Sequence, residues 1–173
     1  EDVYEKGTLM GVFAERTAKS YGFTREEQDE FAIRSLTRAK TAIEDGSFKE
    51  EITPVSFQDR KGETVVEKDE QPLSANLEKI PRLRPAFEKE GTVTAGNSSS
   101  ISDGAAVLVM MSESTAKKRG LTPLARILGH SSFAQSPDWF TTAPIGAIKK
   151  LLEKVGWATH DVDLFEINEA FAT

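Results

Sequence analysis

Two short segments of the sequence carry the side chains best suited to bind a ligand or to take part in a reaction. The first runs from Gly91 to Ala106 and combines glycines, serines and an asparagine beside an apolar stretch. Small side chains let a ligand approach the backbone, and hydroxyl and N–H groups can bind a ligand that carries amide or phosphate groups. A serine-rich turn that caps a helix has the same composition, so both interpretations stay open on these residues alone.

The second segment is Asn168-Glu-Ala-Phe171, which follows an apolar stretch predicted to be a strand. Open α/β sheets place ligand-contacting residues at the carboxyl ends of their strands. In that position the amide of Asn168 can hold a water molecule or donate into an oxyanion hole. The alternative is structural, because asparagine is a good helix N-cap and Glu169 suits the positive end of a helix.

The remaining candidates for chemistry are two histidines and three cations. His130 follows a predicted strand and can line a site, whereas His160 lies in a polar turn. Lys79, Arg82 and Arg84 can meet a phosphorylated ligand, or they can simply be solvated. The sequence has no cysteine, no His-Glu-x-x-His, no Gly-x-Ser-x-Gly and no phosphate-binding Gly-x-x-x-x-Gly-Lys-Ser/Thr. It therefore predicts no metal site and no nucleophile–base pair within these residues.

Composition and charge exclude several classes of protein. The 173 residues include 22 basic and 28 acidic ones, and the net charge of −6 argues against a general binder of nucleic acid or anionic membranes. No stretch approaches the run of about 18 apolar residues that crosses a bilayer. The first residues, Glu1 to Glu5, are mostly acidic, so we expect no signal or transit peptide there.

The elements that must position the two segments differ between the halves of the chain. Up to Glu90 there are 35 charged residues in 90, whereas from Gly91 onward there are 15 in 83, and we place a domain boundary there. In the charged half, capping and stop signals predict two helices and a hairpin, which together form a solvent-facing α-plus-β cap. The expected elements are a helix from Met10 to Tyr21 stopped by Gly22, a helix from the capping box Thr24-Arg-Glu-Glu27 to about Glu44 stopped by Gly46, a hairpin of Ile52 to Phe57 with Glu63 to Val66 around a turn at Asp59 to Gly62, and an extended stretch from Gln71 to Phe87.

The second half predicts alternating strands and helices, which favours an α/β layered fold. We expect strands at Ala105 to Met111, Leu124 to Leu128 and Asp163 to Ile167, and helices from the cap Ser112 to Gly120 and from Pro144 to Val155. Asn168 to Phe171 is predicted to start another helix, so the chain would end inside a helix at Thr173.

Together these stretches resemble the thiolase family, which makes or cleaves 3-ketoacyl-CoA and includes the acetyl-CoA acetyltransferases. They occur in the family's order over nearly the whole chain. The stretches that carry the resemblance are Met10-Gly-Val-Phe-Ala-Glu15, Thr24-Arg-Glu-Glu-Gln-Asp-Glu-Phe-Ala32, Gly46-Ser-Phe-Lys-Glu-Glu-Ile-Thr-Pro54, Leu83-Arg-Pro-Ala-Phe87, Gly91 to Ala106, and Asn168-Glu-Ala-Phe-Ala172.

The resemblance implies an α/β, thiolase-like fold with α-β-α-β-α layers in the complete subunit, of which this chain is a central, incomplete portion. Residues 1–90 would be the loop domain, which covers the active site and holds CoA. Residues 91–120 would end the N-terminal core domain, and residues 121–173 would begin the C-terminal core domain. The family's catalytic histidine and its two reactive cysteines would lie outside the chain.

The resemblance also implies roles for individual residues. Asn168 would hold a water molecule that, with the missing histidine, forms an oxyanion hole for the thioester carbonyl. Leu9 stands where many biosynthetic members have histidine, which leaves the acyl-chain preference and the direction of the reaction open. The substrate-binding residues would be Ser99 on the pantetheine arm, Ala95, Gly96 and Phe87 along its path, and Met10 and Phe171 near the acyl group.

The implied function is acyl transfer between CoA thioesters: thiolytic cleavage or Claisen condensation of a 3-ketoacyl-CoA such as acetoacetyl-CoA. The chain alone would be inactive. CoA would be a substrate, no metal or redox cofactor would be needed, and the partners would be other copies in a homodimer or homotetramer, not nucleic acid or membrane. The expected location is the bacterial cytoplasm or an organellar matrix. Two alternatives stay open: a non-catalytic CoA- or lipid-binding relative, and a structural assembly module.

Overall fold

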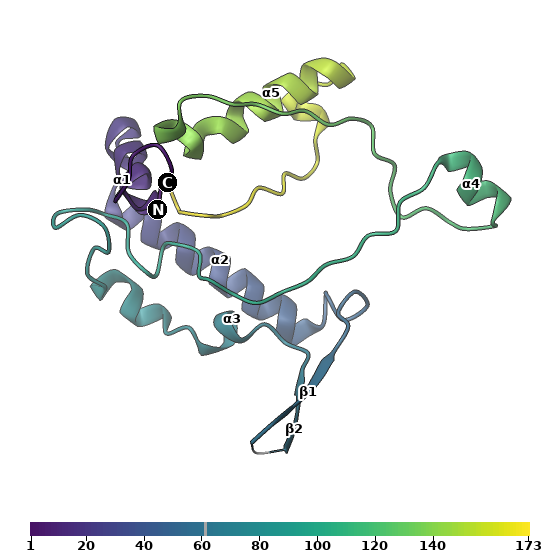
Figure 1. The fold of residues 1–173 in the computed structure, drawn as a ribbon, viewed down its shortest axis with the longest axis horizontal. Coiled ribbons are helices and arrows are strands. Elements are labelled where there is room, and N and C mark those ends of the chain that lie inside the picture. Colours follow the sequence, from purple (N-terminus) through teal and green to yellow (C-terminus); the bar gives the residue numbers. More distant parts are fainter. Residues whose placement is uncertain (61) are drawn as a thin grey trace. The chain divides into compact units, whose positions relative to one another are not determined.

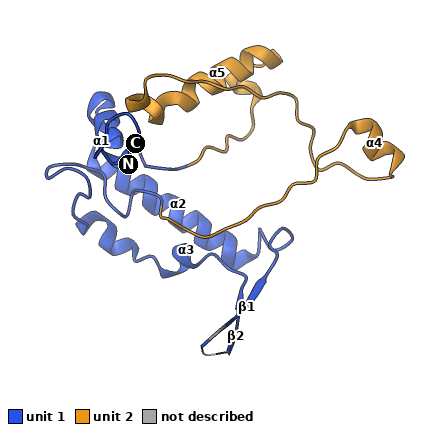
Figure 2. Cartoon of the chain, viewed as in Figure 1, with its two compact units in different colours: residues 1–99, 169–173 blue, residues 100–168 orange. Residues whose placement is uncertain are grey.

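The computed structural model describes residues 1–60 and 62–173, which divide into two compact units (Figures 1 and 2). The first unit contains residues 1–99 and 169–173, so the end of the chain returns to it. The second contains residues 100–168. Both segments singled out for chemistry contribute residues to the first unit.

The first unit begins with helix α1 (Met10–Tyr21), which is amphipathic. Phe13, Ala14 and Ala18 are at most 2 % exposed and belong to its buried face, on which Ala14 and Ala18 lie one helical turn apart. Gly22 ends the helix in the left-handed conformation, with φ 73°, which glycine adopts without steric cost. The predicted bounds of this helix are confirmed.

Helix α2 (Arg25–Asp45) is the longest element of the chain. The Thr24 hydroxyl accepts a hydrogen bond from the Glu27 amide at 3.2 Å, and the Glu27 carboxylate accepts one from the Thr24 amide at 2.8 Å. This reciprocal pair satisfies two N–H groups that would otherwise lack partners at the start of the helix. Gly46 ends the helix, so the predicted capping box and stop are both confirmed.

A hairpin and two short helical turns complete the first unit. β1 (Val55–Asp59) pairs antiparallel with β2 (Gly62–Val66), so a hairpin forms as predicted. Its first strand begins at Val55 and not at Ile52, and Asp59 and Gly62, predicted to lie in the turn, pair with each other; Lys61 lies outside the described residues. α3 (Glu70–Ser74) and the 3₁₀ helix η1 (Leu77–Arg82) follow and pack against α2. The predicted extended stretch from Gln71 to Phe87 is therefore wrong over most of its first half. Pro72 lies in the first turn of α3 and Pro81 lies in a 3₁₀ turn, both places that tolerate proline better than a long α-helix interior does.

The second unit is built around helix α5 (Ala143–Val155), which Gly156 ends as predicted. The segment from Gly129 to Phe133 lies along this helix, where the Ser131 hydroxyl donates to the Ala147 carbonyl at 2.7 Å. The other elements of the unit are α4 (Glu113–Lys118), capped as predicted by the Ser112 hydroxyl, and two 3₁₀ helices, η2 (Pro137–Thr142) and η3 (Thr159–Asp161).

The three strands predicted for the second half are absent from the described residues. The segments Ala105 to Met111, Leu124 to Leu128 and Asp163 to Ile167 form no ladder, and Val107 is 89 % exposed and Leu164 89 %. A strand is stabilised by hydrogen bonds to a neighbour and by burial of its apolar side chains. These apolar segments have neither here, so their composition did not suffice to make them strands.

Candidate substrate-binding site

The loop from Thr92 to Ser99 is held in place by a buried carboxylate from helix α1. Glu15 is 5 % exposed, and its two oxygens accept from the Thr92 amide at 2.9 Å, the Thr92 hydroxyl at 3.1 Å and the Val93 amide at 2.8 Å. Gly91 makes this approach possible, because a Cβ there would lie 2.1 Å from a Glu15 oxygen. The loop is thus shaped by a charge that binds its backbone.

The same loop contacts the end of the chain. Ser98 and Phe171 form an isolated antiparallel bridge. The Ser99 amide donates to the Ala170 carbonyl at 2.9 Å, and the Ala172 amide donates to the Asn97 carbonyl at 3.0 Å. The predicted helix start at Asn168 to Phe171 is therefore wrong, because the N–H and C=O groups of this segment pair with the loop as in a β-bridge. The structure nevertheless brings residues of the two segments together.

Two aromatic side chains lie beside this bridge. The rings of Phe87 and Phe171 meet edge to face, with centroids 6.1 Å apart, a favourable arrangement for aromatic pairs. Phe87 also packs directly on Gly11 in the first turn of α1, where a Cβ would lie 2.2 Å from the ring. Met10 is the first residue of that helix and is half-buried.

A pocket of about 470 Å³ opens next to the loop. Ala95, Gly96 and Ser99 line it, together with Asn97 and Ser98. The rest of its wall comes from α2, from residues 71–83 and from the end of the chain. Of the seven predicted site residues, Ala95, Gly96 and Ser99 are part of the pocket wall, whereas Phe87, Phe171 and Met10 are not. The seventh, Asn168, is exposed and belongs to the second unit.

Both apolar and charged residues line the pocket. Phe31, Leu36 and Ile80 contribute apolar surface, whereas Lys79 is the one cation among the described residues of the wall. Glu169 is its one anion, and its carboxylate accepts a hydrogen bond from the Ser35 hydroxyl. Such a pocket suits an elongated ligand with both apolar and anionic parts.

The sequence patterns predict neither the contribution of α2, α3 and η1 to this pocket nor the role of Glu15 as the anchor of the loop. No local signal marks Glu15, because its partners lie 77 and 78 residues further along the chain. Glu15 is the last residue of one of the stretches that carry the family resemblance, Met10 to Glu15. Of the three predicted cations, Lys79 lines the pocket, and Arg82 and Arg84 are exposed residues outside its wall.

Neither histidine lines the pocket, and Glu5, whose pKa is lowered, does not line it either. His130 and His160 are exposed, and His160 lies 3.8 Å from Asp161. The Arg16 guanidinium, which donates to Glu5 at 2.8 Å, lowers the pKa of that exposed carboxyl below its usual value. Among the described residues there is no cluster of three or more His, Asp or Glu side chains that would hold a metal ion, and none of the helices in residues 1–60 and 62–173 is long and apolar enough to span a membrane.

Known proteins share both the sequence and the fold of this chain. An acetyl-CoA acetyltransferase of Thiocystis violacea is 53 % identical over 165 residues, which cover 94 % of this chain and 42 % of that protein. One of Paracoccus denitrificans is 50 % identical, with the same coverage. The chain thus spans about two fifths of the length of these relatives.

Solved structures of thiolases and acetyl-CoA acetyltransferases have the same fold as this chain. The Bacillus anthracis acetyl-CoA acetyltransferase superimposes with a TM-score of 0.93 at 50 % identity over 97 % of this chain and 43 % of its own. Human mitochondrial 3-ketoacyl-CoA thiolase superimposes with a TM-score of 0.84 at 38 % identity over 94 % of this chain and 42 % of its own. The α/β, thiolase-like fold predicted from the sequence is confirmed. The family model of the thiolase N-terminal domain matches residues 1–114 and that of the C-terminal domain matches residues 121–173, so this chain belongs to the thiolase family.

Proposed function

We propose that the chain is the CoA-binding central part of a thiolase-type acyltransferase. The observation that carries the proposal is the junction of its two polar segments: Ser99 pairs with Ala170, two residues after Asn168, at the edge of a pocket of about 470 Å³. The relatives named acetyl-CoA acetyltransferase and 3-ketoacyl-CoA thiolase support the reaction class. The longer polypeptide that contains these residues is called the complete subunit below.

In this proposal Ser99, Ala95 and Gly96 bind the pantetheine arm of CoA. The small side chains of Ala95 and Gly96 let the arm run close to the backbone, and the Ser99 hydroxyl donates to one of its amides. Phe87 and Phe171, in contact with each other, and Met10 shape the neighbouring apolar surface. Lys79, in the pocket wall, supplies positive charge for a phosphate group of CoA.

The chemistry requires thiols that this chain does not contain. In thiolysis one thiol of the enzyme takes the acyl group of a 3-ketoacyl-CoA, the bond between its α and β carbons breaks, and a second thiol protonates the departing carbon to give acetyl-CoA. The thiol of CoA then takes the acyl group from the first enzyme thiol, which regains its proton. The chain has no cysteine, so both thiols must come from outside these 173 residues. Asn168 contributes a neutral amide that orients a water molecule toward the thioester oxygen as negative charge develops there.

The domain assignment follows the same proposal. Residues 1–90 form the loop domain over the substrate, residues 91–120 end the N-terminal core domain, and residues 121–173 begin the C-terminal core domain. The complete subunit uses CoA as a substrate, needs no metal or redox cofactor and works as a homodimer or homotetramer in the bacterial cytoplasm or an organellar matrix.

The test is a comparison of CoA binding and turnover. The complete subunit should bind CoA in a calorimetric titration and should convert acetoacetyl-CoA and CoA to acetyl-CoA, whereas residues 1–173 alone should show no turnover. A complete subunit that binds CoA without turnover would favour the non-catalytic relative. Turnover by residues 1–173 alone, or a complete subunit that binds no CoA, would contradict the proposal.

A further inference from the structure

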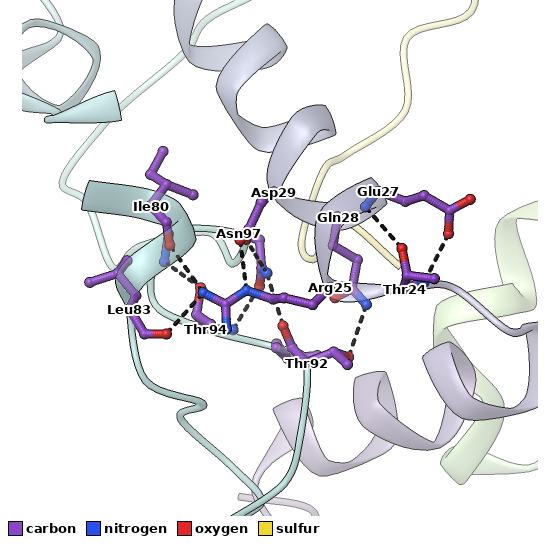
Figure 3. Close-up of polar contacts among 12 residues, drawn as sticks. Thr24, Arg25, Glu27, Gln28, Asp29, Ile80, Leu83, Thr92, Thr94 and Asn97 are labelled. Atoms are coloured by element: carbon purple, nitrogen blue, oxygen red, sulfur yellow. Dashed lines mark hydrogen bonds and ion pairs between the residues drawn. The ribbon is translucent and has the colours of Figure 1, made fainter. Parts of the chain in front are cut away.

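A largely buried polar network joins helix α2 to the loop from Thr92 to Ser99 (Figure 3). Asn97 is 4 % exposed, and all three hydrogen bonds of its side chain are made inside the protein. Its oxygen accepts from the Thr94 amide at 2.7 Å, and its nitrogen donates to an Asp29 carboxylate oxygen and to the Thr92 carbonyl, both at 3.0 Å. The partners are one donor and two acceptors, so they fix the orientation of the amide and demand a side chain with both functions.

Asp29 connects this amide to a cation. It is also 4 % exposed, and its second oxygen accepts from the Arg25 Nε at 2.7 Å. The same guanidinium donates to the carbonyls of Ile80 and Leu83, at 3.0 and 2.9 Å. Helix α2 therefore holds two stretches of the pocket wall through one buried chain of charge-assisted bonds: residues 80–83 through Arg25, and the loop through Asp29.

The backbone of Asn97 extends the network to the end of the chain. Its carbonyl accepts from the Ala172 amide, and two residues on, the Ser99 amide donates to the Ala170 carbonyl. The position of the Asn97 side chain therefore sets the register in which Ser99 faces residues 170–172. Ser99 is itself exposed, whereas Asn97, two residues before it, is buried, so the buried amide anchors this end of the loop.

We propose that Asp29 and Asn97 are positioning residues that hold Ser99 in its CoA-binding position, an inference that rests on the proposed function. Neither side chain needs to touch CoA. They act through the loop backbone, because a loop already held in its bound conformation loses less entropy when the ligand binds.

The test exchanges the two side chains in the complete subunit. Asn97→Asp turns an oxygen toward both the Asp29 carboxylate and the Thr92 carbonyl, so the loop should shift away. Asp29→Asn removes the charge that orients the amide and is the milder change. In the double variant Asp29→Asn/Asn97→Asp, the new amide can donate to residue 97 and accept from Arg25. This restores the bond between residues 29 and 97 with reversed polarity and keeps the bond from Arg25, whereas the Thr92 carbonyl still faces an oxygen of residue 97, so the rescue should be partial.

Two measurements are made at a temperature where every variant is folded. The first is the dissociation constant of CoA, which should rise at least about tenfold in Asn97→Asp and fall by about threefold from that value in the double variant. The second, without CoA, is hydrogen exchange of the Ser99 amide, which should accelerate in Asn97→Asp and recover in part in the double variant. A control that reverses the exposed pair Lys40 and Glu44 on α2, 3.9 Å apart, should change neither.

The outcomes separate the two proposals. If Asn97→Asp lowers the melting temperature but leaves the CoA dissociation constant and Ser99 exchange as in wild type, the residues are merely structural and the inference is wrong. A double variant no better than Asn97→Asp would also overturn it. Failure of the wild-type subunit to bind CoA would instead contradict the proposed function, and the exchange of Ser99 would still report on the network.

Discussion

Removing the carboxylate of Glu15 should release the loop from Thr92 to Ser99 from helix α1. Glu15→Ala would leave the amide of the fully buried Val93 and that of the half-buried Thr92 without their acceptors. An unsatisfied buried group costs about 1–3 kcal/mol, so the two amides together cost about 2–6 kcal/mol. Glu15→Gln keeps one oxygen for one amide and turns its NH₂ group toward the other, so we expect about half of that cost, roughly 1–3 kcal/mol.

The loss should be local, so we would measure it by hydrogen exchange of residues 92–93 in the complete subunit. Since about 1.4 kcal/mol is a factor of ten, protection of these amides should fall at least about tenfold in Glu15→Ala and less in Glu15→Gln. Glu5→Gln is the matched control, because it removes an exposed carboxylate. That carboxylate pairs with Arg16, which lies on the same helix as Glu15. It should leave protection at residues 92–93 unchanged.

One result would refute the reasoning. If protection at residues 92–93 in Glu15→Ala equals that in the Glu5→Gln control, the carboxylate does not hold the loop. The buried amides must then be satisfied in another way, for example by water that enters the space left by the side chain.

Three other predictions test separate parts of the account. Thr24→Ala should destabilise α2 by about 1 kcal/mol, because the Glu27 amide loses its cap, and a variant that melts like wild type would show that Thr24 is not the cap. Asn168→Asp should keep a melting temperature near wild type but lower kcat of the complete subunit at least about tenfold, because it places a negative charge beside a developing oxyanion; near-normal kcat would leave Asn168 without a catalytic role. Lys79→Ala should weaken CoA binding about two- to fivefold but should not weaken binding of pantetheine, which has no phosphate. The control Arg82→Ala, outside the pocket wall, should affect neither ligand. Equal losses for CoA and pantetheine in Lys79→Ala would argue against a phosphate contact.

Helix ends could be predicted from the sequence because their causes are local. The hydroxyl of Thr24 and the carboxylate of Glu27 are three residues apart, and the stops at Gly22, Gly46 and Gly156 need only a left-handed residue. These signals do not depend on the rest of the chain, so the bounds of the long helices were right to within about a residue or two.

The strands and the site depend on contacts between distant residues. Ala105 to Met111 is apolar enough for a buried strand, but a strand needs a partner, and none pairs with it among the described residues. In the site, Asn97 meets Asp29 across 68 residues, and nothing in the sequence around either residue predicts that contact. Ala95, Gly96 and Ser99 were proposed from the family resemblance, whereas the pocket they line could be described only from the fold.

The most direct test of the central claim is a map of where CoA protects the complete subunit. Hydrogen exchange would be compared with and without saturating CoA, peptide by peptide. The account predicts slower exchange at residues 95–99 and at Lys79, Ile80 and Leu83, which line the pocket, and no change in strands β1 and β2, whose described residues are not part of its wall. CoA that binds and leaves residues 95–99 unprotected would contradict the account.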